Sequence, residues 1–155
     1  MSTTGSCLCG TVRFDIEGAF DAFYLCHCGR CRKDTGSAHA ANLFASKARL
    51  LWRQGEAQVR TFRLPDTRHA RAFCARCGSA MPYASEGFVV VPAGSLDTPL
   101  SIAPQAHLFL SCRAEWDRRL EHLPGFEGLP PAHDEDASAG AVSLAQAADT
   151  RSQTS

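Results

Sequence analysis

The sequence predicts one mainly β domain in which short strands are organised around cysteine clusters. Seven of the eight cysteines fall into three clusters, at residues 7–9, 26–31 and 74–77. Short β-prone segments alternate with turns rich in Gly, Pro and Asp, which is typical of a mainly β fold with little helix. With 155 residues and 45% hydrophobic side chains, the chain can form one modest core that a bound metal would reinforce.

The first half of the chain contains five expected elements. Residues 11–17 alternate between apolar and charged side chains, as a half-buried strand does. After a glycine, residues 20–24 form a returning strand. The loop with the second cysteine cluster follows, and residues 31–34 form a short helical turn in it. Residues 40–45 form another strand, and residues 46–51 a helical turn, because their first residue is a serine that can cap a helix start.

The second half is expected to contain further short strands, at residues 57–64, 68–73, 79–83, 88–92 and 107–110. From about Pro130 onward the sequence has no aromatic residues and is rich in Ala, Ser, Asp and Gln. Such a segment buries too little apolar surface to offset its ordering entropy. We therefore expect a folded zinc-binding domain at residues 1–130 and a disordered tail at residues 131–155.

Charge and hydropathy exclude several classes of partner. Sixteen basic and sixteen acidic residues give a formal net charge of zero, so no nucleic-acid partner is expected. The N-terminus has no signal-peptide pattern, and no apolar run approaches the roughly 20 residues of a membrane helix. A cytoplasmic location is predicted. In that reducing compartment, clustered cysteines indicate metal binding or catalysis more often than disulfides.

The first and third clusters predict a structural zinc site. Side chains at i and i+2 of an extended chain point to the same side, so Cys7 and Cys9 can reach one ion. Cys74 and Cys77 have the spacing of a zinc knuckle. Together they supply four thiolates, which close a tetrahedral site and contribute directly to folding. The alternative is that both pairs are buried as small hydrophobic residues.

The second cluster predicts a three-thiolate zinc site with an open fourth position, formed by Cys26, Cys28 and Cys31. His27 lies between two of these ligands and is interpreted as an outer-shell or packing residue. Two alternatives remain open. Cys112 or His39 could complete a second closed site, or the triplet could share ligands with the knuckle at residues 74–77.

Three anionic sulfurs make zinc a poorer Lewis acid than three imidazoles would, so such a site is less suited to forming hydroxide. It is well suited to binding an incoming thiol as a nucleophilic thiolate. The chemistry predicted for the triplet is thiol capture and addition to a small electrophile such as an aldehyde. Arg30, Arg32 and Lys33 flank the loop and are interpreted either as ligands of a substrate carboxylate or as a solvated basic face.

Several separated motifs together resemble the glutathione-dependent formaldehyde-activating enzyme family, which also includes centromere protein V. They are SCLCGTVRF at residues 6–14, CHCGRCRKDTGS at 26–37, FCARCGS at 73–79, GSLD at 94–97, His107, Trp116 and LPGF at 123–126. The resemblance implies twisted antiparallel sheets around zinc knuckles. It also implies two zinc ions, one structural and one catalytic, with the ligand sets given above.

The activity implied by the resemblance is that of a carbon–sulfur lyase that condenses formaldehyde with glutathione to S-(hydroxymethyl)glutathione. Two departures bear on substrate and ligands. Residues 32–35 read RKDT, where members of the formaldehyde-activating type carry a Trp-Lys-Pro-Glu-like stretch. Cys112 stands where many members have serine and is interpreted as a buried small residue rather than a fourth ligand or resolving thiol.

Other aromatic residues are interpreted as packing, with His107 at a strand edge and Trp52 in the core. Trp116 and Phe126 could line a pocket, but the core is the usual place for such aromatic residues in small β domains. The leading hypothesis is a zinc-dependent enzyme acting on a glutathione-like thiol and a small carbonyl compound, or on their adduct. The alternatives are a non-catalytic zinc module with two closed structural sites that binds a partner, and a thiol-redox protein that uses the triplet.

Overall fold

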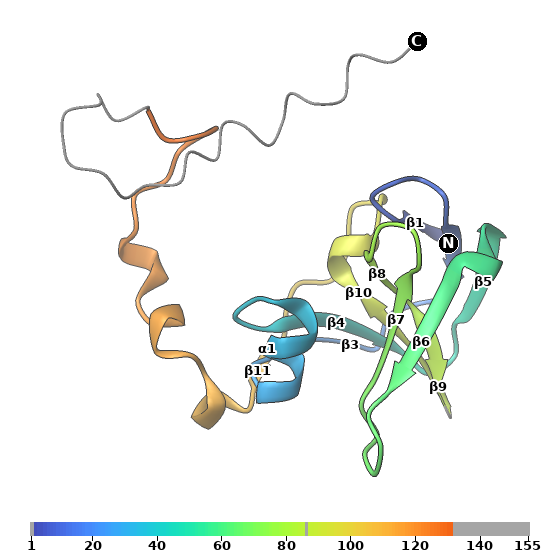
Figure 1. The fold of residues 1–155 in the computed structure, drawn as a ribbon, viewed down its shortest axis with the longest axis horizontal. Helices are drawn as coiled ribbons and strands as arrows, with labels where there is room; N and C mark the ends of the chain where they lie inside the picture. The colour runs from blue at the N-terminus through green and yellow to red at the C-terminus, as the bar shows by residue number, and fades with distance from the viewer. Residues whose placement is uncertain (1, 86, 132–155) are drawn as a thin grey trace. The chain divides into compact units, whose positions relative to one another are not determined.

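The computed structural model of the chain describes residues 2–85 and 87–131. By their internal contacts the residues group into two units, Met1–Glu121 and His122–Ser155. All of the strands described lie in the first unit, as Figure 1 shows. The expected tail at residues 131–155 falls outside the described residues except for its first residue. No helix of the described ranges is long and apolar enough to cross a membrane.

The fold is mainly β, as the sequence predicts, with one short α-helix. The strands are β1 (Ser2–Ser6), β2 (Arg13–Glu17), β3 (Ala22–Cys26), β4 (Ala40–Ala45), β5 (Arg49–Gln54), β6 (Val59–Arg63), β7 (Ala70–Cys74), β8 (Ala80–Met81), β9 (Tyr83–Ser85), β10 (Phe88–Pro92) and β11 (Ala106–Leu108). The helix is α1 (Gly29–Thr35). Single 3-10 turns are η1 (Glu56–Gln58), η2 (Ala93–Ser95), η3 (Leu110–Cys112), η4 (Glu115–Asp117) and η5 (Leu120–His122).

The strands form three small sheets. Their orders are β1-β2-β5, β11-β3-β4-β10-β9 and β6-β7-β8. Every pairing in them is antiparallel except that of β11 with β3, which is parallel. Because β11 joins the edge of β3, the chain after residue 105 returns to the strand that leads into the second cysteine cluster.

The core lies where the inner faces of the sheets meet. Alternation along β2 puts Phe14 and Ile16 inside, with Leu43 of β4 and Val91 of β10. Phe14 also packs edge-on against Trp52, whose ring centroid is 6.0 Å away, so the packing expected of Trp52 is confirmed. Cys7 and Cys74 belong to the same buried cluster. The first cysteine set is therefore part of the core itself.

The expected strands at residues 40–45 and 88–92 match β4 and β10 at both ends. The helical turn expected over residues 46–51 is wrong, because the chain enters β5 at Arg49 and pairs along β2. In that pairing Leu50 stands opposite Ile16. Ser46 could cap a helix, but Leu50 and Trp52 pack against the core when the segment is a strand paired with β2. This packing outweighs the local preference for a helical turn.

The other expected strands exist with shifted bounds or different partners. β3 does not return on β2 but pairs with β4 and β11. The strand expected at residues 79–83 is divided into β8 and β9 around Pro82, which has no amide hydrogen to donate to a ladder. β1 has the sequence STTGS and was not expected, since it lacks apolar alternation.

Candidate metal centres

The first candidate centre joins two turns from different sheets. Cys7 and Cys9 lie in a tight turn directly after β1, where the amide of Gly10 donates to the carbonyl of Cys7 at 2.8 Å. The extended conformation expected for this pair is therefore wrong. Cys74 ends β7, and the amide of Gly78 donates to its carbonyl at 2.8 Å. This turn needs a glycine, because Gly78 has a φ of 74°.

The ligand atoms of Cys7, Cys9, Cys74 and Cys77 all lie within 4.8 Å of one another. Cys7 and Cys74 are buried, whereas Cys9 is exposed and Cys77 half-buried. Four sulfurs at this separation are the donor set of a closed tetrahedral zinc site. This group of cysteines could hold a metal ion, and it would join the sheet of β1 to the sheet of β7.

Hydrogen bonds around the first group favour thiolates at two positions. The hydroxyl of Ser79 lies 3.3 Å from Cys77 Sγ, and side-chain and backbone hydrogen bonds from Ser79 lower the pKa of Cys77 to about 5. Hydrogen bonds from Thr11 lower the pKa of Cys9. Burial instead raises the pKa of Cys7, so a bound cation would favour the thiolate form of this sulfur.

The second candidate centre is local to one loop. Cys26 ends β3, Cys28 is the N-cap residue of α1, and Cys31 lies in the first turns of that helix. Cys28 takes the N-cap conformation because its sulfur accepts from the amide of Cys31, at 3.4 Å. The helix ends at Gly36, which has the left-handed conformation that favours glycine. The helical turn expected over residues 31–34 is confirmed and is longer than expected.

The three sulfurs of this triplet lie within 4.8 Å of one another, and all three side chains are half-buried. Burial raises the pKa of Cys31 and of Cys26. Burial also acts to raise the pKa of Cys28, but hydrogen bonds from the amide of Cys31 and from the neighbouring thiols outweigh it, so its pKa is lowered. The triplet fits a metal that takes thiolate ligands, and Cys28 is the sulfur best prepared to be anionic.

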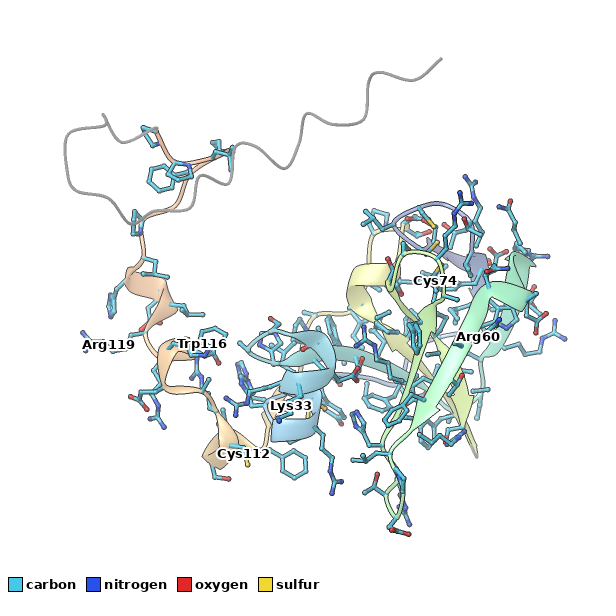
Figure 2. The ribbon with its side chains drawn as sticks, viewed as in Figure 1. Lys33, Arg60, Cys74, Cys112, Trp116 and Arg119 are labelled. Carbon is cyan, nitrogen blue, oxygen red and sulfur yellow. The ribbon has the colours of Figure 1, made fainter. Side chains whose placement is uncertain are left out.

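The residues considered as a fourth ligand lie outside the triplet. Cys112 is exposed, at the end of η3, and its sulfur lies 4.0 Å from the hydroxyl of Ser111; Figure 2 labels it. The buried-residue interpretation of Cys112 is therefore wrong. His39 belongs to a different group, with His27 and Asp117. Among the described residues, the group around Cys28 consists of three sulfurs.

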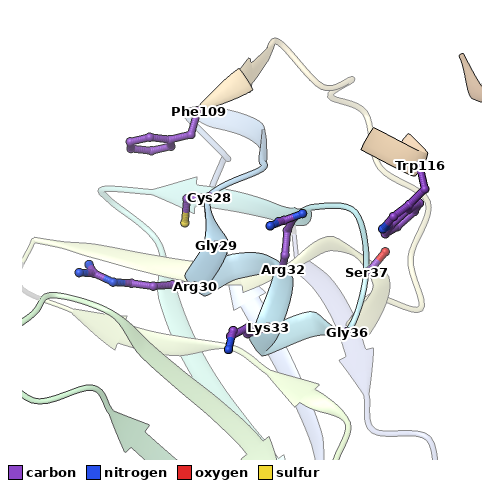
Figure 3. A pocket seen from close by; sticks show the side chains of 9 residues that line it. All are labelled: Cys28, Gly29, Arg30, Arg32, Lys33, Gly36, Ser37, Phe109 and Trp116. Carbon is purple, nitrogen blue, oxygen red and sulfur yellow. The ribbon is translucent and has the colours of Figure 1, made fainter. Parts of the chain in front are cut away.

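Two hollows meet at Cys28. One has a volume of about 750 Å³ and is lined by Cys28, Gly29, Arg30, Arg32, Lys33, Gly36, Ser37, Phe109 and Trp116, as Figure 3 shows. The other has a volume of about 660 Å³ and contains all three triplet cysteines among its lining residues. Cys28, Arg30 and Phe109 line both. Cys28 is thus the triplet cysteine that lines both hollows.

The first hollow combines cations with exposed aromatic rings. Trp116 is 64% exposed and Phe109 is 61% exposed, so the core position expected of Trp116 is wrong, as it is for Phe126, which is 54% exposed. Phe109 has a φ of 57°, a left-handed backbone that is costly for an aromatic residue and that is common at functional sites. Phe109 stands in an apolar, strand-like run of the sequence, and this context did not indicate that it lines a hollow.

His27, which stands between Cys26 and Cys28 in the sequence, is buried against protein side chains, as expected of a packing residue. Its Nε2 lies 2.9 Å from Nδ1 of His107, and its Nδ1 lies 3.2 Å from a carboxylate oxygen of Asp117. Burial lowers the pKa of His27. Asp117 was not singled out in the sequence, because nothing in its local context marks it as a partner of a residue so far along the chain.

A family profile and a sequence relative agree with the motif resemblance. A profile of the family described as "Glutathione-dependent formaldehyde-activating enzyme" matches residues 2–112, which contain all eight cysteines. A Halomonas elongata protein named "Putative glutathione-dependent formaldehyde-activating enzyme" is 33% identical over 130 residues, which cover 75% of this chain and 80% of that protein. A crystal structure of a Rhodobacter sphaeroides protein is 21% identical, with a TM-score of 0.49, and covers 67% of this chain and 98% of that chain.

Proposed function

Because this chain belongs to the glutathione-dependent formaldehyde-activating enzyme family, we propose that it is a zinc-dependent carbon–sulfur lyase. Its substrates are a glutathione-like thiol and a small aldehyde, or the adduct that the two form. The observation that carries this proposal is the grouping of three sulfurs within 4.8 Å at a point where two hollows meet.

The two cysteine groups have different roles in this proposal. Cys7, Cys9, Cys74 and Cys77 would hold a structural zinc with no free position. Cys26, Cys28 and Cys31 would hold the catalytic zinc. When it is bound by three thiolates, zinc supplies an exchangeable fourth position that favours the thiolate form of an incoming thiol at neutral pH.

Basic side chains beside the triplet would bind and orient the thiol substrate. Arg30, Arg32 and Lys33 line the hollow next to Cys28. The guanidinium groups of the two arginines would bind a substrate carboxylate in a fixed geometry. Phe109 and Trp116 would cover the bound substrate and reduce its contact with water.

The proposed reaction balances without an oxidant or reductant. The sulfur of the thiol forms a bond to the carbonyl carbon, and the π-electron pair of the C=O bond moves to oxygen. The proton lost by the thiol ends on that oxygen, which gives a hydroxymethyl thioether when the aldehyde is formaldehyde. Cleavage of the adduct is the same sequence in reverse.

Replacing one triplet sulfur tests the proposal. We expect Cys28→Ser to lower zinc content from two ions per chain to one, to leave the far-ultraviolet circular dichroism unchanged and to lose turnover. Cys112→Ser is the matched control, since Cys112 lies outside the triplet group, and it should retain both zinc ions and activity. Full activity in Cys28→Ser would contradict the catalytic role of the triplet.

X-ray absorption at zinc distinguishes the enzyme from a non-catalytic module with two closed sites. For an open triplet, the mean number of sulfur ligands per zinc is below four and rises when glutathione is added. For two closed sites, the number is four and does not respond to glutathione. The second result would overturn the proposal even if the protein binds two zinc ions.

A further inference from the structure

A polar network around the buried side chains of His27 and Asp117 lies next to the triplet loop. His27, which separates Cys26 from Cys28 in the sequence, has a relative exposure of 1%. One ring nitrogen lies 3.2 Å from Asp117 Oδ2 and the other lies 2.9 Å from His107 Nδ1. His27 thus has a hydrogen-bonding contact with His107 on one side and a close contact with the Asp117 carboxylate on the other. These contacts restrain the backbone from which the two neighbouring cysteines extend.

Asp117 is the charged centre of the network. It is 2% exposed, and Arg113 donates to it twice, from Nε to Oδ2 at 2.8 Å and from an amino group to its carbonyl at 2.7 Å. Burial acts to raise the pKa of Asp117, but the hydrogen bond and charge of Arg113 outweigh it, so the pKa is lowered and the carboxylate is ionised at neutral pH.

The network connects two segments that are far apart in the sequence. β11 pairs in parallel with β3, and the amide of His27 donates to the carbonyl of Leu108 at 2.9 Å. The segment after β11 carries Phe109 and, next to Asp117, Trp116. These contacts thus join the loop that holds Cys28 to the segment that lines the hollow beside it.

We propose that Asp117 is a positioning residue of the triplet centre: through His27 it fixes the loop of Cys26 and Cys28, and it also holds Trp116 at the adjoining hollow. This inference rests on the function proposed above. Residues that orient metal ligands from outside the coordination shell typically change metal affinity or activity by 10- to 100-fold when they are replaced. A carboxylate that is buried beside a loop of ligands is in a position to act in this way.

The same atoms also resemble a two-histidine, one-carboxylate metal site. Ligand atoms of His27, His39 and Asp117 lie within 4.8 Å of one another. Nδ1 of His39 is buried without a hydrogen-bond partner among the described residues. Nδ1 of His27 is also buried, and it lies 3.2 Å from Asp117 Oδ2 without hydrogen-bond geometry. The guanidinium of Arg113 already contacts Asp117 Oδ2, and its positive charge would repel a cation bound there. We therefore infer that these three residues contact one another without a metal ion. The experiment below would detect a third metal if one were bound.

The test is Asp117→Asn in the full chain loaded with zinc. Zinc release to a chromogenic chelator is followed under native conditions, together with kcat, KM and quenching of tryptophan fluorescence by acrylamide. We expect one of the two zinc ions to leave about tenfold faster, the other to leave at the unchanged rate, and kcat to fall by a larger factor than KM rises. Quenching of the fluorescence, to which both Trp52 and Trp116 contribute, should increase.

A matched control lies in the same segment. Glu115 is 88% exposed and forms an ion pair with Arg118, with its oxygen 2.9 Å from Arg118 Nε. Glu115→Gln removes a carboxylate two residues from Asp117 without touching the network, and it should change none of these readouts. If Asp117→Asn folds poorly, Arg113→Lys keeps both charges and should show a smaller change of the same kind.

Three results would overturn the inference. Unchanged zinc release and kinetics in Asp117→Asn would exclude a positioning role. Equal acceleration of both zinc ions would indicate a general loss of stability. A third equivalent of metal in the parent protein that is lost in Asp117→Asn would identify a metal site instead. Failure of the lyase proposal is distinguishable, because the release of zinc is measured without substrate.

Discussion

The two cysteine groups have similar ligands and opposite surroundings. The group of Cys7 and Cys74 joins turns from two sheets, and two of its sulfurs lie in the hydrophobic core. The triplet is contained in one loop between β3 and α1, and it opens on two hollows. The first group is thus built into the core, whereas the triplet lies at hollows that small molecules can enter.

Sequence separation explains why the first group would matter more for stability. A metal that joins residues far apart in the chain removes much loop entropy from the unfolded state, whereas a metal that closes a short loop removes little. A local site can therefore lose its metal at small cost to the fold. This difference makes a catalytic role easier for the triplet than for the first group.

The largest effect is expected from a change in the first group. Cys74 is completely buried and its sulfur belongs to both the metal group and the core. In Cys74→Ser we expect loss of the folded state, because structural zinc binding in small domains contributes folding free energy of the order of 10 kcal/mol. Circular dichroism and zinc content measured at 25 °C check this outcome. A folded Cys74→Ser protein with one zinc would show that the first group is not structural.

The second-largest effect is expected when a chelator removes metal stepwise from the parent protein. The triplet offers three sulfurs instead of four, and burial raises the pKa of two of them, Cys26 and Cys31, so protons compete more strongly for this site. With increasing chelator we expect activity to disappear with the first zinc equivalent while the fold remains. Unfolding should accompany the second. Simultaneous loss of activity and fold would remove the distinction between the two groups.

A smaller effect is expected from Gly5, which leads into the first group. A Cβ atom at this position would come within 2.5 Å of the carbonyl of Ser95 and also overlap the ring of Phe14. Overpacking of this kind typically costs about 1–3 kcal/mol, which lowers Tm by several degrees in a chain of this size. Gly5→Ala should also speed zinc release from the first group and leave the triplet unaffected.

The control for this variant is Gly94→Ala. A Cβ atom at Gly94 would meet no atom within 4 Å, so Tm and zinc release should stay at the parent values. Thermal unfolding followed by circular dichroism gives the comparison. Equal Tm values for the two variants would mean that β1 adapts to the added methyl group, and that the connection of Cys7 to the core is looser than the structure indicates.

The grouping of the sulfurs was predictable because spacing carries local geometry. The spacing of Cys74 and Cys77 predicts a zinc knuckle, and the spacing of the triplet predicts a single loop. Neither prediction depends on how the rest of the chain folds. Strands such as β4 and β10 were predictable for a similar reason, since runs of apolar residues between turn residues favour buried strands. That the groups hold zinc stays a prediction.

What could not be predicted depends on contacts between distant segments. Asp117 meets His27 only because β11 returns to the edge of β3, and no local pattern encodes a parallel pairing of that range. Phe109 lines the hollows because of a left-handed backbone in an apolar segment. β5 replaced a capped helical turn because β2 offered it a partner. In each case tertiary packing overrode local preference.

The smallest change is expected from replacing Cys112, the eighth cysteine. This variant tests most directly whether one cysteine group is open and the other closed. If Cys112 completed the triplet, both groups would be closed and the difference in their roles would disappear. The sulfur of Cys112 is exposed and lies outside the group formed by Cys26, Cys28 and Cys31. In Cys112→Ser, zinc content, the zinc-release rates of both sites and turnover should therefore equal the parent values. Loss of one zinc ion or faster release from one site would mean that Cys112 is a ligand, and the open position on which the proposed chemistry depends would not exist.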